Sequence, residues 1–105
     1  MNEITVADLK GMLERKENFQ LIDVREEFEY ETSNLNGENI PLSSVLLEKD
    51  KIRTDIPVII HCRSGKRSAQ AIQLLQQDGG YENLSNLQGG ILAWRDTYAP
   101  EMLVY

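Results

Sequence analysis

Cysteine and histidine each occur only once in this chain of 105 residues, as Cys62 and His61. A single cysteine excludes an internal disulfide and a cysteine-based zinc cage. A single histidine excludes the metal motifs that use two histidines. The sequence therefore predicts no metal site.

Long apolar runs and a targeting signal are also missing. No run approaches the ~20 apolar residues that cross a bilayer. Residues 1–5 lack the basic flank and apolar core of a signal peptide. We therefore expect no membrane partner. The default location is cytoplasmic, because a lone thiol fits a reducing compartment.

An excess of basic charge, on which nucleic-acid binders depend, is absent as well. The chain has 17 acidic and 11 basic residues, a net charge of −6, so we expect no nucleic-acid partner. No acid occurs from Ile56 to Gln77, and that stretch contains Arg63, Lys66 and Arg67. In an acidic protein this basic island suggests a local anion site, although the start of a solvated helix would look the same by charge alone.

Hydrophobic residues make up 41% and charged residues 27% of the chain, which is typical of a globular domain, here expected to span residues 1–105. Strands and helices alternate. We predict strands at residues 19–24, 39–41, 57–62 and 83–87, and helices at 5–18, 26–31, 43–47, 67–78 and 90–99. The strand at 57–62 has a β-branched run without polar alternation, as parallel strands covered on both faces do. The pattern predicts an α/β fold whose parallel sheet carries helices on both faces.

Several local features are predicted with these elements. We expect Thr5 to cap the first helix with Asp8 three residues on, and Asn18 to close it. Phe28 is the expected inward residue of the acidic helix, and the acids around it are interpreted as a solvated face. Ser43 is expected to cap a helix. We also expect Gly89 and Gly90 to form a close turn and Trp94 to belong to the core.

Cys62 ends the buried strand and opens a loop around Gly65 that runs into a helix. Ligands of open α/β sheets bind at the carboxyl ends of the strands, where this cysteine lies. Inward-facing N–H groups, the helix dipole and the nearby bases all favour a thiolate. A nucleophile beside an anion cradle indicates covalent transfer of a group from an anionic donor. The simpler alternative is a small buried core residue.

Three other polar side chains flank this strand and its neighbour. His61 precedes Cys62 on a strand, so its side chain points to the opposite face of the sheet. We interpret it as a structural histidine rather than a general base. Asp23 and Arg25 lie on one side of their strand, where we expect a structural ion pair. Orientation of the Cys62 loop is their alternative role.

Four segments in order resemble the single-domain rhodanese-type sulfurtransferases. The run Cys62–Ser68 resembles the active-site loop of that family, and Leu21–Glu26 resembles its early strand. Asn39–Leu42, and Leu87–Ile91 with Trp94, match two further segments, so the resemblance covers nearly the whole chain. It implies a five-stranded α/β fold and a persulfide intermediate on Cys62. It also implies that the backbone N–H groups of the loop bind the transferred sulfur.

The chain departs from this family in one connection. The family usually has Gly-His-Ile-x-Gly-Ala and one more residue before its Asn-Ile-Pro. Residues 33–38 stand in that place here, with one residue fewer and with Asn34 where the histidine would be. Because of this difference, the resemblance does not predict the shape of the connection at residues 33–38. The difference does not involve the expected nucleophile, Cys62.

The function expected from these observations is a sulfurtransferase that works by double displacement. The Cys62 thiolate takes sulfur from a small anionic donor such as thiosulfate and passes it to a thiophilic acceptor, either a thiol or a carrier protein. No metal or organic cofactor is needed. The expected substrate-binding residues are Arg63, Ser64, Gly65, Lys66, Arg67 and Ser68, with Asp23 and Arg25 in support.

Three alternatives remain beside this reading. The chain also fits a sulfur-relay or protein-binding module with little turnover, or a redox-sensing cysteine. Cysteine phosphatases and arsenate reductases are more distant, because phosphatases use Cys-x5-Arg and the sixth residue after Cys62 is Ser68. Arg67 stands one residue early, and the shorter loop suits a single sulfur atom better than a tetrahedral oxyanion.

Overall fold

The fold is an α/β structure around a five-stranded parallel sheet, as the sequence predicted. The computed structural model describes residues 1–105, and its strand order is β1-β5-β4-β2-β3. The strands are β1 (Glu3–Ile4), β2 (Gln20–Asp23), β3 (Glu38–Asn39), β4 (Val58–His61) and β5 (Leu84–Leu87). The helices are α1 (Val6–Glu14), α2 (Glu27–Thr32), α3 (Lys66–Asp78) and α4 (Gly90–Tyr98), with short 3₁₀ turns η1 (Leu42–Ser44) and η2 (Lys49–Lys51).

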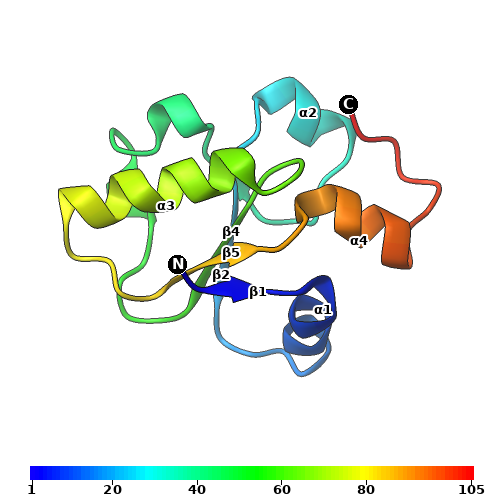
Figure 1. The fold of residues 1–105 in the computed structure, drawn as a ribbon, viewed down its shortest axis with the longest axis horizontal. Coiled ribbons are helices and arrows are strands. Elements are labelled where there is room, and N and C mark those ends of the chain that lie inside the picture. The colour runs from blue at the N-terminus through cyan, green and yellow to red at the C-terminus, as the bar shows by residue number, and fades with distance from the viewer.

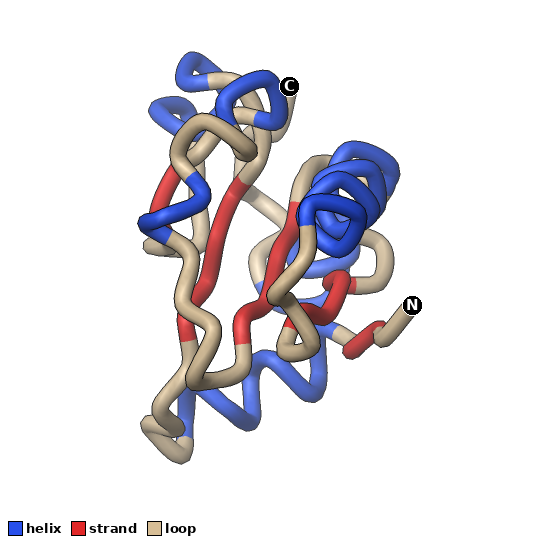
Figure 2. Tube along the Cα trace, turned by 90° about the vertical axis from the view of Figure 1, so that its left-hand side faces the viewer, coloured by secondary structure: helices blue, strands red, loops and turns tan.

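Helices cover both faces of the sheet (Figures 1 and 2). On one face α3 packs Ala71, Ile72 and Leu75 against the strands. On the other face, Leu9 of α1 and Ile91 of α4 belong to a second core cluster. None of the helices combines the length and the hydrophobicity that a membrane span requires.

The central strand β4 is buried at all four positions, in agreement with its unbroken apolar pattern. Because successive side chains of a strand alternate, its residues divide between the two cores. Ile60 and Cys62 belong to the core beneath α3, whereas Ile59 belongs to the core beneath α1 and α4. The alternation places the side chain of His61 on the face opposite Cys62.

The first helix begins as predicted and ends earlier. Thr5 and Asp8 form the expected capping box, in which each side chain accepts the backbone N–H of the other. The helix ends at Glu14, not at Asn18. Lys16 adopts a left-handed φ of 53°, a conformation that a continuing helix does not allow. The two-residue strand β1, too short for a periodic signal, was not predicted.

The inward residue of α2 is not the one that hydrophobicity predicted. Phe28 is 61% exposed, whereas Glu29 is buried. The reason is a charged partner: Glu29 lies against Arg67 of α3 and forms an ion pair with it. Pairing of opposite charges outweighs the preference of the phenyl ring for the interior, so the acidic run is only partly a solvated face.

The predicted helix from Ser43 is absent. Residues 42–51 form η1 and η2 with turns between them, and Ser43 makes no capping bond. The N–H groups of Ser44 and Val45 donate three residues back, which tightens the backbone into a 3₁₀ turn. Of the residues 43–47 predicted as helical, only Val45 is part of the core, and Leu47 is exposed. One buried side chain does not sustain an amphipathic α-helix.

Candidate active site

Cys62 lies directly after β4, with its side chain turned towards α3 and 1% exposed. The backbone N–H of Gly65 donates to its Sγ at 3.1 Å, and the hydroxyl oxygen of Ser68 lies 3.4 Å from the same sulfur. Gly65 has a left-handed φ of 111°, which an L side chain would strain. The glycine therefore allows the turn that brings the loop's N–H groups to the sulfur.

Burial raises the pKa of the Cys62 thiol, and hydrogen bonds act against it. The backbone N–H groups of Ser68, Gly65 and Ser64 stabilise the thiolate, and so does the Ser68 hydroxyl when its hydrogen faces the sulfur. Together they outweigh burial and bring the pKa of Cys62 below its ordinary value. The sulfur is thus both shielded from solvent and disposed to ionise.

Asn86 of β5 forms hydrogen bonds to this loop and to Ser68, and it was not among the predicted site residues. Its side-chain Nδ2 donates to the carbonyl of Gly65 at 3.1 Å, and its Oδ1 accepts the hydroxyl of Ser68 at 2.5 Å. Asn86 is 3% exposed. Its position next to the family-like Leu87–Ile91 segment is the one signal that could have drawn attention to it.

The residues that follow the Gly89–Gly90 turn also form hydrogen bonds to the Cys62 loop. The first N–H groups of α4, those of Ile91 and Leu92, donate to the carbonyls of Cys62 and Arg63 at 2.9 and 3.1 Å. In a trans peptide the N–H points away from the carbonyl of the same peptide group. The N–H groups of Arg63 and Ser64, which share peptide groups with these two carbonyls, therefore face away from α4. A Cβ on Gly90 would lie 2.5 Å from both carbonyl oxygens, which shows how closely the two segments approach.

The three loop bases have different surroundings. Arg67 donates to both carboxylate oxygens of Glu29 at 2.7 and 3.0 Å. Arg63 donates through Nε to the backbone carbonyl of Tyr105 at 2.8 Å. Lys66 is exposed at the start of α3. The structure thus brings all three bases to the loop, with two of them bound to the protein's own oxygens.

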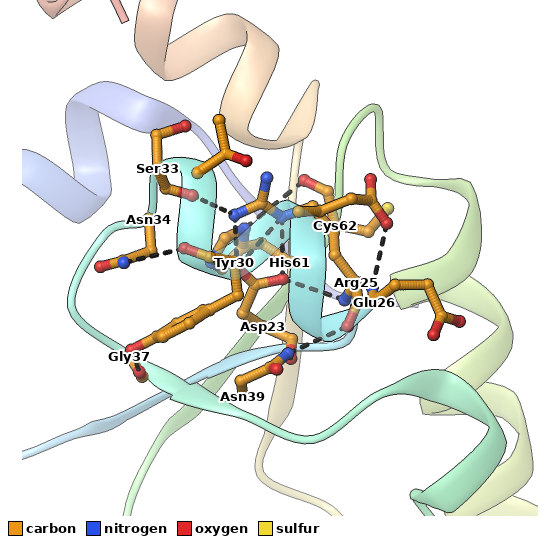
Figure 3. A network of polar contacts seen from close by, with 12 residues as sticks. Asp23, Arg25, Glu26, Tyr30, Ser33, Asn34, Gly37, Asn39, His61 and Cys62 are labelled. Carbon is orange, nitrogen blue, oxygen red and sulfur yellow. Dashed lines mark hydrogen bonds and ion pairs between the residues drawn. The ribbon is translucent and has the colours of Figure 1, made fainter. Parts of the chain in front are cut away.

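Asp23 and Arg25 form the expected ion pair (Figure 3). Strand alternation places this pair on the face of the sheet opposite Cys62. Both side chains are fully buried, and Arg25 Nη2 lies 2.7 Å from Asp23 Oδ2. The same Nη2 donates to the carbonyl of Ser33 at 2.8 Å. His61 Nε2 lies 3.7 Å from Asp23 Oδ2, and burial lowers the pKa of His61 although the carboxylate acts against it. This is the structural setting expected for His61.

The shortened connection at residues 33–38 closes without the family histidine. The Asn34 side chain accepts the N–H of Asn36 at 2.8 Å and donates to the carbonyl of Tyr30 at 3.0 Å. Asn36 takes the left-handed φ of 66° that asparagine tolerates. Asn34 therefore stabilises a tight turn beside α2, and the carbonyl of Ser33 remains available to Arg25.

The fold and the loop define an α/β domain with one shielded, acidic thiol at the carboxyl edge of a parallel sheet. Comparison with known proteins gives the family. The profile described as "Rhodanese-like domain" matches residues 5–97, and the chain belongs to this family.

The relatives agree with this assignment. A sulfurtransferase of Allochromatium vinosum is 36% identical over 90% of this chain and 88% of its own length. An uncharacterized Bacillus subtilis protein, YqhL, is 46% identical over 71% of this chain and 60% of its length. The crystal structure of a rhodanese-related protein from Thermoplasma volcanium has a TM-score of 0.80 and 32% identity, covering 95% of this chain and 96% of that one.

Some relatives are much longer than this chain. The probable adenylyltransferase/sulfurtransferase MoeZ of Mycobacterium tuberculosis is 30% identical over 97% of this chain, which spans only 26% of it. The chain likewise spans less than two thirds of YqhL. The family's general chemistry, transfer of sulfur, is thus supported, whereas the activities of these whole proteins do not follow from the match.

Proposed function

We propose that this chain moves sulfane sulfur from an anionic donor such as thiosulfate to a thiophilic acceptor through a persulfide on Cys62. The observation that carries the proposal is the setting of the sulfur. Cys62 Sγ accepts the N–H of Gly65, and the nearby N–H groups of Ser64 and Ser68 likewise favour the thiolate that the reaction needs.

The reaction takes place in two displacements. The Cys62 thiolate attacks the outer sulfur of thiosulfate, a new S–S bond forms, and the old S–S bond breaks with its electron pair leaving on sulfite. The persulfide then carries its negative charge on the outer sulfur. A thiophilic acceptor attacks that sulfur, and the electron pair of the S–S bond returns to Cys62 as thiolate.

The surrounding residues are assigned supporting parts in this proposal. Lys66 attracts the donor, and Arg63 adds a charge at the loop. Arg67 interacts electrostatically with Cys62, but its ion pair with Glu29 neutralises most of the charge that it offers a donor. Ser64, Gly65 and Ser68 present hydrogen-bond donors to the reacting sulfur. Asp23 and Arg25 act at a distance, by fixing the end of β2 and the connection at Ser33.

Intact-protein mass spectrometry tests the proposal. After incubation with thiosulfate and removal of excess donor, the protein should carry one additional sulfur atom that cyanide removes. Cys62→Ala should gain none, and Cys62→Ser provides a control closer in size and polarity. An unchanged mass for the wild-type protein, in the absence of reductant, would refute transfer from this donor.

A second candidate is a sulfur-relay module that receives its sulfur from a partner protein. Cys62 is 1% exposed, and Arg63 and Arg67 are bound within the protein, which leaves a small donor only Lys66 as a free base. Relatives named an adenylyltransferase/sulfurtransferase and a putative sulfur carrier protein support this candidate. A partner that is retained by Cys62→Ala, together with no persulfide from thiosulfate in the wild type, would favour the relay.

A further inference from the structure

The Ser68 hydroxyl has one hydrogen and faces two acceptors. On one side lies Cys62 Sγ at 3.4 Å, and on the other lies Asn86 Oδ1 at 2.5 Å. All three side chains are buried, so water does not supply a second donor. A hydroxyl can donate only once, although its oxygen can still accept.

The orientation of the Asn86 amide is fixed by its other partner. Its Nδ2 donates to the carbonyl of Gly65 at 3.1 Å, so a flipped amide would set two acceptor oxygens against each other. Oδ1 therefore faces Ser68 and can only accept. In this arrangement the hydrogen of Ser68 points to Asn86, and the lone pairs of Ser68 Oγ face the sulfur.

We propose that Asn86 is a positioning residue that competes with Cys62 for the hydroxyl hydrogen of Ser68 and thereby favours the persulfide form over the free thiolate. The part of this proposal that concerns the persulfide rests on the proposed function. The competition for the hydroxyl hydrogen of Ser68 does not rest on the proposed function, because it applies to the protein without any sulfur donor.

Cys62 can be a thiol, a thiolate or a persulfide, and each form leads to a different arrangement of hydrogen bonds among Cys62, Ser68 and Asn86. The thiol donates to Ser68 Oγ, which donates to Asn86 Oδ1, so each acceptor has a donor. The thiolate has no hydrogen to donate, so the single hydrogen of Ser68 must serve one of two buried acceptors. Ser68 either leaves Asn86 Oδ1 unpaired or withholds its hydrogen from a charged sulfur that then relies on backbone N–H groups such as that of Gly65, and either outcome is costly. In the persulfide the charge lies on the outer sulfur, Sγ is a weak acceptor, and Ser68 stays with Asn86. Asn86 thus penalises only the thiolate.

The charged groups around the sulfur do not change this comparison. Arg67 of α3 interacts electrostatically with Cys62, and Glu29 of α2 offsets it. On the opposite face of the sheet, Asp23 and His61 belong to β2 and β4. None of these side chains forms a hydrogen bond or ion pair with Asn86 or the Ser68 hydroxyl, so a change at Asn86 isolates the hydrogen bond.

Titration of the thiolate by its ultraviolet absorbance tests the proposal in the whole chain without donor. Asn86→Leu releases the Ser68 hydroxyl to the sulfur, so the thiolate fraction at a pH below the pKa of Cys62 should rise about tenfold. Asn86→Ala should do the same and serves if the leucine variant does not fold. Combined with Ser68→Ala, neither change should raise the thiolate fraction.

If the role of Asn86 were purely structural, its replacement would lower the thiolate fraction of Cys62 instead of raising it. Loss of its bond to Gly65 alone would loosen the loop and withdraw the Gly65 N–H from the sulfur, which lowers the thiolate fraction. A fall, or an equal rise in the Ser68→Ala background, overturns the proposal. Asn83→Leu is the matched control: Asn83 binds the carbonyls of Arg53 and Ile56 just before β5, and its loss should leave the titration unchanged.

The persulfide part has its own measurement. At fixed thiosulfate and sulfite, and at a pH where Cys62 is ionised, the ratio of persulfide to free protein should be about tenfold lower in Asn86→Leu than in the wild type. An equal ratio of persulfide to free protein in Asn86→Leu and in the wild type would overturn the claim that Asn86 favours the persulfide. Absence of persulfide in both proteins refutes the proposed function instead, while the titration still decides the role of Asn86.

Discussion

Glu29 of α2 and Arg67 of α3 form a two-point ion pair beside the Cys62 loop, with N···O distances of 2.7 and 3.0 Å. Glu29 is buried, whereas the side chain of Arg67 is 31% exposed. The pair links the short helix α2 to the start of the helix that follows the cysteine. It also neutralises one of the three charges that the loop sequence offers.

Replacement of Glu29 should make stability less dependent on pH. The hydrogen bonds from Arg67 hold the pKa of Glu29 below its ordinary value of 4.5, although burial acts against them. A carboxyl with a lowered pKa stabilises the fold above that ordinary value and loses this contribution as the pH falls through the lowered one. Glu29→Gln should cost about 1–2 kcal/mol at pH 7 and little in strong acid, measured by urea unfolding.

The exposed Glu31 on the same helix supplies the control, because Glu31→Gln should leave the unfolding curve unchanged at either pH. A loss of stability in Glu29→Gln that is the same at neutral and at strongly acidic pH would contradict the assignment to this ion pair.

Replacement of Lys66 should weaken the use of anionic donors. The side chain of Lys66 is exposed and has no hydrogen-bond partner, whereas Arg63, which is also exposed, is bound to the Tyr105 carbonyl. A charge-assisted contact contributes about 1.5 kcal/mol, so Lys66→Gln should raise the KM for thiosulfate about tenfold in steady-state assays. Lys10→Gln, on α1 at a distance from the loop, should leave it unchanged. An equal effect of both variants would indicate only the loss of net charge.

Addition of one methyl group at Gly90 should disrupt the site. Its Cβ would lie 2.5 Å from the carbonyls of Cys62 and Arg63. Gly90→Ala should cost about 2–4 kcal/mol in thermal unfolding and abolish persulfide formation. Gly80 also has a positive φ, 89°, but nothing within 4 Å of a Cβ. Gly80→Ala should therefore cost only about 1–2 kcal/mol and keep the persulfide, and a similar loss of persulfide in both would disprove this explanation.

Removal of one partner of the buried Asp23–Arg25 pair should destabilise the fold strongly. Both side chains are 0% exposed, so Arg25→Met leaves an uncompensated carboxylate and should cost about 3–5 kcal/mol by chemical denaturation. The double change Asp23→Leu with Arg25→Met should recover much of this loss. The exposed pair Arg53–Asp55 is the control, and Arg53→Met should have no measurable effect. A mild effect of Arg25→Met would mean that water or another base reaches Asp23.

Local sequence patterns predicted the layers of this fold well. The unbroken apolar run that predicted β4 is a property of neighbouring residues. The same is true of the helical spacing that places the buried residues of α3 on one face: Ser68, Ala71, Ile72 and Leu75. Strand alternation likewise separated His61 from Cys62. The two-residue β1 has no periodicity to detect, and it exists because β5 offers it an edge.

The errors arose where a distant partner decides the conformation. Glu29 is buried because Arg67 lies opposite, 38 residues along the chain, and no local pattern contains that information. Asn86 looked like an ordinary strand residue until Gly65 and Ser68 came to lie above it. The glycines at 89 and 90 were correctly expected to form a close turn, but that the turn abuts the cysteine's own carbonyl is a tertiary fact.

The hydrogen bonds from α4 to the carbonyls of Cys62 and Arg63 form late, because α4 is synthesised after the loop that it orients. Ribosomes make the cysteine long before the residues that turn its peptide groups, because Ile91 and Leu92 follow it by about a quarter of the chain. A nascent chain that ends at Gln88 contains Cys62 but lacks the two donors that orient its loop. The thiol therefore acquires its folded surroundings only after the start of α4 has been synthesised.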